Sequence, residues 1–371
     1  MRLLGGMGAE EFLRDYWQKR PLLIRRAVPG FIGLLDWEQM QSLAARDDML
    51  SRLVECREGV WSLEHGPFAP RKLTLLDGSS NWSVLVSNLN HVLPEAAELL
   101  YQFNFVPYAR LDDLMVSYAL AGGGVGPHFD SYDVFLLQAQ GRKRWQISSQ
   151  QDQTLIEGAP LRILKHFEPE QEWLLEPGDM LYLPPKFAHN GIADEPGMTY
   201  SIGFRAPTAQ ELAAQFLVHL SEHVQLAGMY ADPDLKLSDH PAELSSAMLD
   251  RVENMLAEIR WQRRDIASFL GVYLSEPKNH VFFDPPADLL DFDEFVDVVA
   301  ERGIRLDLKS QILFCNGDFF INGEEISVVD ELVHDKLTEL ADRRRLPPQE
   351  LPDELNEHLY EWYQCGYLCL G

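Results

Sequence analysis

Residues 114–135 read LMVSYALAGGGVGPHFDSYDVF, and this stretch decides the fold. An apolar run of strand length leads into a glycine-rich turn, and a second run of β-forming residues follows it. The same alternation continues to about residue 206 through VFLLQ, GRKRWQI, EWLLEPGD, MLYLPP and TYSIGFRA. Short, evenly spaced runs separated by Gly and Pro predict a β-barrel or a β-sandwich.

Helical patterns surround this β-rich region. Residues 9–17, 36–43 and 95–103 precede it and predict helices that flank the sheet. After Pro207, the stretch TAQELAAQFLVHLSEHVQLAGMY places apolar residues at helical spacing, with Thr208 as the expected N-cap. A second helical run is predicted at about residues 242–270. Two helices in series with little else indicate an interaction or dimerisation element.

The last part of the chain has a mixed pattern. A helix is predicted at residues 291–301, followed by the strand-like runs LDLKSQILFC and DFFINGEEISV and by two further helices. Asn316-Gly317 and Asn322-Gly323 are strong signals for hairpin turns. We therefore expect an α+β chain whose domains span residues 1–207, 208–275 and 276–371, the last of winged-helix type.

The overall charge narrows the choice of partners. The 371 residues carry 32 Lys and Arg against 58 Asp and Glu, a net charge of −26. Such a field repels nucleic acid and attracts a basic protein, so direct nucleic-acid binding is not expected. Four scattered cysteines exclude a disulfide framework. No apolar run reaches the length of a signal peptide or a membrane span, which predicts a cytoplasmic protein without membrane contact.

Three residues could bind a metal ion. His128 and Asp130 are two positions apart, so an extended strand would place both side chains on one face. His189 follows the turn and strand of EPGDMLYLPP and is expected at a strand start or a loop on the rim. Two imidazoles and one carboxylate suit non-haem Fe(II). An isolated HxD recurs by chance, but the glycine-rich lead-in and the downstream PPxxxH favour the metal site.

The run GRKRWQI could bind an anion. Strand alternation places Lys143, Trp145 and Ile147 on one face, which as the apolar face should point inward. A buried ammonium needs an anionic partner, and the distal carboxylate of a metal-bound keto diacid would supply one. Ser117 could donate its hydroxyl to the same carboxylate. The alternative is a basic edge strand in which Lys143 reaches the rim.

These residues resemble a known family. The order HFD, then Lys143, then His189 after PPKFA resembles the JmjC-domain 2-oxoglutarate oxygenases. The strings WQKRPLLI, NWSVLV, LEPGDMLYLPPKFAHNG and YSIGFRAP are similar to those of the bacterial ribosomal oxygenases among them. The resemblance implies a double-stranded β-helix (cupin/JmjC) barrel, a helical dimerisation region and a winged-helix-like C-terminal module.

The resemblance also implies an activity and its residues. His128, Asp130 and His189 would be the ligands of Fe(II), and Lys143 with Ser117 would hold the co-substrate 2-oxoglutarate. The enzyme would be a dimeric dioxygenase, a 3-hydroxylase of an arginine side chain in large-subunit ribosomal protein sixteen. Bacterial relatives place arginine where this chain has Lys143, and lysine lacks the bidentate fork of arginine, so it should hold the carboxylate less directionally.

Other interpretations remain open at this stage. The same chemistry could act on a histidyl or another protein side chain. Asp112, Asp113 and Asp133 are candidates to hold a substrate guanidinium, or they are solvated carboxylates. The stretch HLSEH places His219, Glu222 and His223 in the HxxEH pattern of inverted zinc peptidases, which is a different class of enzyme.

Overall fold

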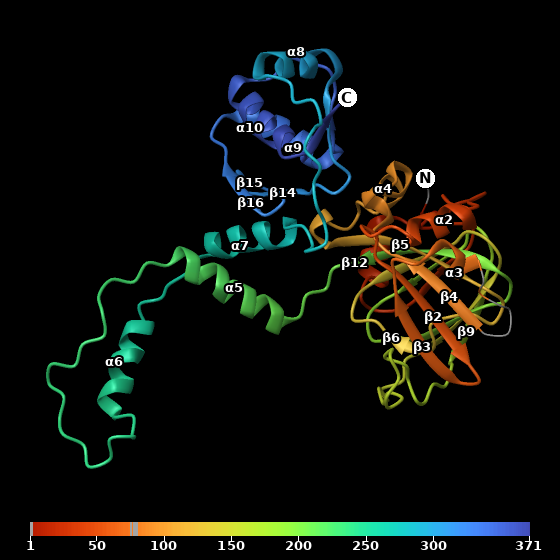
Figure 1. The fold of residues 1–371 in the computed structure, drawn as a ribbon, viewed down its shortest axis with the longest axis horizontal. Coiled ribbons are helices and arrows are strands. Elements are labelled where there is room, and N and C mark those ends of the chain that lie inside the picture. The colour runs from red at the N-terminus through yellow and green to blue at the C-terminus, as the bar shows by residue number, and fades with distance from the viewer. Residues whose placement is uncertain (1–2, 75, 77–80) are drawn as a thin grey trace. The chain divides into compact units, whose positions relative to one another are not determined.

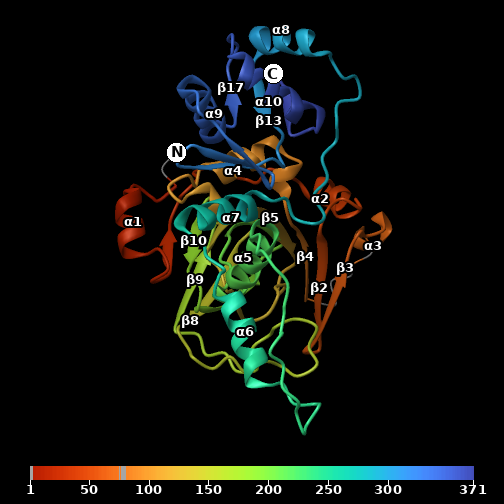
Figure 2. The same ribbon diagram turned by 90° about the vertical axis from the view of Figure 1, so that its left-hand side faces the viewer.

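The computed structural model describes residues 3–74, 76 and 81–371, and it divides into two compact units (Figures 1 and 2). The first comprises Met1–Ala206 with Asn279–Phe283 and Asp307–Lys309, and the second comprises the rest of the chain from Pro207 on. The division into domains 1–207, 208–275 and 276–371 stays a prediction. None of the helices in the described parts of the chain combines the length and the apolar character that a membrane-spanning segment needs.

Two antiparallel sheets form the first unit, as the β-rich pattern predicted. The large sheet contains, in spatial order, β1 (Leu22–Ile24), β10 (Met180–Leu183), β7 (Val134–Gln138), β12 (Gly197–Phe204), β5 (Leu111–Ala119), β4 (Asn81–Val86), β2 (Ser51–Arg57) and β3 (Val60–His65). The small sheet contains β6 (His128–Phe129), β11 (Ala188–Ala193), β8 (Lys143–Ser148) and β9 (Gln171–Leu175).

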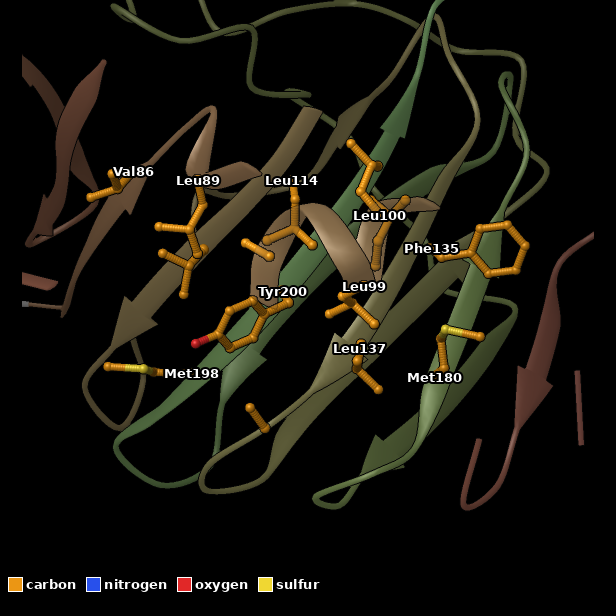
Figure 3. Packing of buried hydrophobic residues seen from close by; sticks show 14 of the residues in the cluster. Val86, Leu89, Leu99, Leu100, Leu114, Phe135, Leu137, Met180, Met198 and Tyr200 are labelled. Atoms are coloured by element: carbon orange, nitrogen blue, oxygen red, sulfur yellow. The ribbon is translucent and has the colours of Figure 1, made fainter. Parts of the chain in front are cut away.

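Strand alternation gives the large sheet two apolar faces. Its inner face packs on the small sheet through Val134, Leu136, Leu181 and Leu183, which contact Trp145 and Ile147 of β8. Its outer face presents the alternate residues Phe135, Leu137 and Met180 of these strands, together with Tyr200 of β12 (Figure 3). Because both faces are buried, these strands read as nearly continuous apolar runs.

Short helices cover the outer face of the large sheet. They are α1 (Ala9–Asp15), α2 (Trp37–Ala44), α3 (Pro70–Thr74) and α4 (Pro94–Tyr101), with 3-10 turns at Leu89–His91 and Tyr108–Arg110. Leu99 and Leu100 of α4 pack on the sheet beside Leu114 (Figure 3). Asp36 and Gln39 form a capping box at the start of α2. The three helices predicted to flank the sheet are therefore present, each within a few residues of its predicted range.

The second unit begins with three helices. Thr208 caps α5 (Ala209–His223) through a capping box with Glu211, as expected. The single run predicted at about residues 242–270 is wrong, because α6 (Ser246–Leu256) and α7 (Arg263–Ser275) are separate helices. Ser245 caps α6, and Gln262 and Asp265 form a capping box that starts α7. The second cap makes a new helix begin where the apolar spacing alone suggested continuity.

The C-terminal module contains three helices and two small sheets. Its elements are α8 (Phe292–Arg302), β13 (Ile304–Leu306), β14 (Ile312–Cys315), β15 (Asp318–Ile321), β16 (Glu324–Ser327), α9 (Glu331–Arg343), β17 (Arg345–Leu346), α10 (Asp353–Gln364) and β18 (Leu368–Leu370). Asn316-Gly317 joins β14 to β15 and Asn322-Gly323 joins β15 to β16, all four residues with positive φ. Both predicted hairpins are confirmed, since a two-residue type I′ turn needs that conformation.

Candidate metal centre

The small sheet brings the two histidines of the predicted metal site together. β6 pairs with the start of β11 so that His128 lies directly opposite His189, with their ring centroids 4.3 Å apart. Asp130 follows β6 and places one carboxylate oxygen 3.7 Å from Nε2 of His128 and the other 3.4 Å from Nε2 of His189. Ligand atoms of all three residues lie within 4.8 Å of one another. The sequence expectation that His189 sits at a strand start is confirmed.

Hydrogen bonds orient both imidazoles. Nδ1 of His128 lies 2.9 Å from the carbonyl oxygen of Gly126, and Nδ1 of His189 lies 3.1 Å from that of Phe187. A carbonyl can only accept, so each Nδ1 donates and each Nε2 keeps its lone pair. This is the arrangement by which metal-binding histidines are usually held. The donor set therefore fits a divalent iron ion.

The protonation states also suit a metal ion. Burial, reinforced by the neighbouring His189, lowers the pKa of His128 to about 4, so its imidazole is neutral at physiological pH. Burial acts to raise the pKa of Asp130, but its two histidine neighbours, His189 foremost, outweigh burial and lower it, so the carboxyl group is ionised. A neutral imidazole and an ionised carboxylate are the forms that bind metal.

Lys143 lies inside the barrel, as strand alternation predicted. β8 is flanked by β11 and β9, so the alternative of a basic edge strand is wrong. Lys143 is buried with its Nζ 5.0 Å from the centroid of the Trp145 ring, and burial lowers its pKa to about 8. Nε1 of Trp145 is buried and has no hydrogen-bond partner among the described residues. A buried cation beside an unsatisfied donor fits the carboxylate of a small anion.

Ser117 belongs to a polar row that the sequence analysis missed. It lies on β5 opposite Thr199 of β12, which in turn lies opposite Gln138 of β7. The hydroxyl of Thr199 donates to Oε1 of Gln138 at 2.9 Å, and Oγ of Ser117 contacts the carbonyl of Thr199 at 3.4 Å. All three side chains are buried. Pairing with β7 places Thr199 on the inner face of the large sheet, since it shares that face with Ser201, which lies opposite Leu136.

The three aspartates proposed for a substrate guanidinium have other partners. Asp133 is fully buried, and it accepts hydrogen bonds from the hydroxyl of Tyr182 at 2.6 Å and from Nε2 of Gln18 at 2.9 Å. The interpretation of Asp133 as a substrate-binding or solvated residue is therefore wrong, because its buried carboxylate is hydrogen-bonded to side chains of the same unit. Asp112 lies 3.5 Å from Arg205, and Asp113 accepts from the backbone of Asn88 at 3.1 Å.

Tyr132 is a site residue that sequence reasoning did not single out. It follows Asp130 by two positions and its side chain interacts with the Asp130 carboxylate. Burial, followed by the charges of Asp130 and Asp113, raises its pKa, so it stays protonated as a hydrogen-bond donor. The string HFDSY carried no clear signal for it, because β6 ends at Phe129 and Tyr132 lies in a bend beyond the strand.

The HLSEH stretch shows no metal-binding geometry beyond a pair of histidines. His219 and His223 stack on α5 with ring centroids 4.3 Å apart, and Nδ1 of His223 donates to the carbonyl of His219 at 2.7 Å. Among the described residues, the group of His128, Asp130 and His189 is the one set of three that could hold a metal ion. Nothing in the described structure supports the zinc peptidase alternative.

Comparisons with known proteins identify two domains and several relatives. Residues 98–212 match a model of the JmjC domain, and residues 258–369 match a model of the ROXA-like winged helix. The chain is 34% identical to ribosomal protein uL16 3-hydroxylase of Escherichia coli over 94% of its own length and 92% of that protein. It is 31% identical to a probable ribosomal oxygenase of Haemophilus influenzae, covering 94% and 89% of the two chains.

Solved structures give the same result. An X-ray structure of E. coli ycfD superposes with a TM-score of 0.86 at 31% identity and covers 99% of each chain. The structure of YcfD in complex with cobalt and 2-oxoglutarate superposes with a TM-score of 0.82 at 32% identity and covers 98% of each. The predicted fold class, with its barrel, helical region and winged-helix module, is confirmed. The chain thus belongs to the JmjC-domain ribosomal oxygenases, the Fe(II)- and 2-oxoglutarate-dependent enzymes that its sequence motifs resemble.

Proposed function

We propose that this chain hydroxylates an arginine side chain of large-subunit ribosomal protein sixteen in the cytoplasm. The single observation that carries its chemistry is the convergence of His128, Asp130 and His189 on ligand atoms within 4.8 Å of one another. The target protein is inferred from the E. coli relative, which is named ribosomal protein uL16 3-hydroxylase. The arginine side chain is inferred from the family that the sequence motifs resemble. A net charge of −26 favours a basic substrate.

The three converging residues would bind Fe(II). Each imidazole would offer its Nε2 and Asp130 one carboxylate oxygen, which leaves part of the coordination shell open. When bound, Fe(II) supplies the activation of dioxygen that hydroxylation of an unreactive C–H bond requires. The protein holds both rings in place through the carbonyls of Gly126 and Phe187, so the ligands are positioned before the metal enters.

Lys143 would hold the distal carboxylate of 2-oxoglutarate. Its ammonium is buried beside the unsatisfied N–H of Trp145, and Ser117 would add a hydroxyl group from the opposite sheet. An anion at this place offsets the cost of burying the lysine charge. Because this part of the barrel is buried, water would be excluded from the bound co-substrate, and side reactions would be suppressed.

Turnover of a defined peptide tests this proposal. An arginine-containing peptide of ribosomal protein sixteen should gain the mass of one oxygen atom, with one succinate formed per hydroxylated peptide. A matched peptide with lysine in place of the arginine should remain unchanged. Hydroxylation of a histidine instead would refute the arginine assignment and leave the oxygenase chemistry intact. Succinate formation that is independent of any peptide would refute the protein substrate.

We also propose that the chain acts as a homodimer through α6. This helix has no buried residue, and its apolar side chains recur at helical spacing. The exposed set is Met248, Leu249, Val252, Met255 and Leu256. An isolated helix of 11 residues is only marginally stable in water, so a second copy of the chain is the partner that would stabilise it.

The mass of the particle in solution tests the dimer. Light scattering should give twice the chain mass, and Leu249→Asp with Val252→Asp should give a monomer. A control that adds the same two negative charges to the other side of the helix, Ala247→Asp with Asn254→Asp, should remain dimeric. A monomeric wild-type protein would contradict this assignment without affecting the oxygenase proposal.

A further inference from the structure

The C-terminal module contains a basic pocket that the oxygenase chemistry does not use. It encloses about 460 Å³ beside the ends of α8 and α9. Its lining comprises Arg302, Ile304, Arg305, Arg343, Arg345, Leu346, Pro347, Pro348 and Gly371. Among the described residues, four arginines and no acidic side chain line this pocket.

The pocket is lined by positive charge, although the module as a whole is strongly acidic. Residues 281–371 contain 7 Lys and Arg against 21 Asp and Glu, a net charge of −14. Four of those seven basic residues are the arginines of the pocket. More than half of the basic residues of this acidic module therefore line a single pocket.

Helix ends account for two of the four arginines. Arg302 ends α8 and Arg343 ends α9, where the helix dipole favours a cation. Arg343 also pairs with Glu339 of its own helix at 2.9 Å. These two residues have a structural reason to be present whether or not the pocket binds a ligand.

The other two arginines have no such reason. Arg305 of β13 and Arg345 of β17 are direct partners in an antiparallel pair, and both are exposed. Like charges directly opposite each other destabilise a strand pair. On its other side Arg305 faces Cys369 of β18, which offers no carboxylate. Neither arginine forms an ion pair with a described side chain of the module.

We propose that this pocket binds a nucleoside diphosphate, whose phosphates would lie between Arg305 and Arg345. Planar guanidinium groups match phosphate oxygens in paired hydrogen bonds. The exposed rings of Pro347 and Pro348 give the pocket an apolar wall against which a base can rest. The volume falls in the range of about 300–1,000 Å³ that is usual for small-molecule sites. The net charge of −26 opposes any anion at long range, so binding here would depend on the local charge of the arginines.

Calorimetry on the full chain, at low and constant ionic strength, tests this site. ADP should bind, pyrophosphate should bind more weakly, and adenosine should not bind measurably. Arg305→Gln with Arg345→Gln should weaken ADP binding by at least about tenfold, because two charge-assisted contacts are lost. The control Arg263→Gln with Arg264→Gln removes the same charge from exposed positions at the start of α7 and should leave the affinity unchanged.

Further measurements separate this site from the metal centre and from a fold defect. His189→Ala should leave ADP affinity unchanged, since the pocket does not involve the iron ligands. Without ADP, the Arg305→Gln/Arg345→Gln variant should melt at the same or a higher temperature than the wild type, because the repulsion is relieved. If the double variant does not fold, Arg345→Gln alone is compared in the same assay. Absence of ADP binding below millimolar concentration, an equal loss in the control variant, or binding of an RNA strand that ADP does not displace would overturn the proposal.

Discussion

His128 and His189 lie opposite each other in the pair formed by β6 and β11, although β11 starts 60 residues after β6 in the sequence. Their rings are 4.3 Å apart at the centroids, and each is held by a backbone carbonyl two residues before it. Register between β6 and β11 thus determines the geometry of the metal centre. A shift of one residue would turn one histidine to the other face of the sheet.

The first prediction concerns these ligands. His189→Ala should remove binding of Fe(II) and reduce hydroxylation by at least about a hundredfold, since only two ligands remain. Metal content and peptide turnover measure the two effects. His219→Ala, which removes a histidine of α5 outside the metal centre, is the matched control and should keep both. Loss of activity in that control would instead revive the HxxEH site.

The second prediction concerns the pH dependence of co-substrate binding. Lys143 has a pKa of about 8 in the free protein, so its charge is lost as pH rises above that value. The KM for 2-oxoglutarate should therefore increase above pH 8, by up to about tenfold per pH unit. Lys143→Arg should abolish this increase, because arginine stays charged. A KM that rises equally in both proteins would exclude Lys143 as the anchor.

The same shift has a consequence for stability. The pKa of Lys143 is lower in the folded chain than its ordinary value of 10.5, so the unfolded chain binds more protons between about pH 8 and pH 10.5. For this group, the free energy of unfolding of the ligand-free protein should rise with pH across that window. Urea denaturation of wild type and Lys143→Met, compared over the same range, isolates the contribution of the lysine.

The third prediction concerns Gly191, which lies opposite Trp145 on the neighbouring strand. A Cβ atom at this position would lie 2.7 Å from the Trp145 ring and 3.0 Å from Cε of Lys143. Gly191→Ala should cost about 1–3 kcal/mol of stability and raise the KM for 2-oxoglutarate, because both side chains must shift. Gly8→Ala, where no atom lies within 4 Å of the added Cβ, should leave that KM unchanged. An unaltered KM in Gly191→Ala would show that Lys143 tolerates displacement.

The fourth prediction concerns Asp133. Its carboxylate is fully buried and bonded to Tyr182 and Gln18, so Asp133→Ala should cost about 3 kcal/mol or more in the free energy of unfolding. Asp112→Ala should cost about 1 kcal/mol or less, since its pairing with Arg205 is partly exposed. Denaturant titration distinguishes the two. Similar losses in both variants would contradict the structural role given to Asp133.

Much of the barrel was predictable because its strands carry simple signals. Alternation placed Lys143 and Trp145 inward, and the Asn-Gly pairs marked both hairpins of the C-terminal module. The polar row of Ser117, Thr199 and Gln138 was missed because a row of this kind depends on the order of strands in the sheet. That order places β12 between β5 and β7, although β12 lies far from both in sequence. The spacing of residues within one strand carries no information about its neighbours.

Asp133 and the boundary between α6 and α7 show two further limits. A carboxylate next to an apolar run reads as solvated, and only the positions of Tyr182 and Gln18, from distant segments, allow it to be buried. The apolar spacing of residues 242–270 continues through the break, while the capping interactions of Gln262 and Asp265 depend on local backbone geometry. In both cases the structure depends on hydrogen bonds of polar side chains, which the periodic spacing of apolar residues does not predict.

The shortness of β6 has a consequence for how the metal centre assembles. β6 is a two-residue strand at the edge of its sheet, whereas β11 is held on its other side by six register pairs with β8. The amides around His128 should therefore exchange their hydrogens with solvent much faster than those around His189, through an opening that leaves the rest of the barrel folded. Metal would slow that exchange by joining the edge strand to the sheet, so loading of the ion and local ordering would be one event.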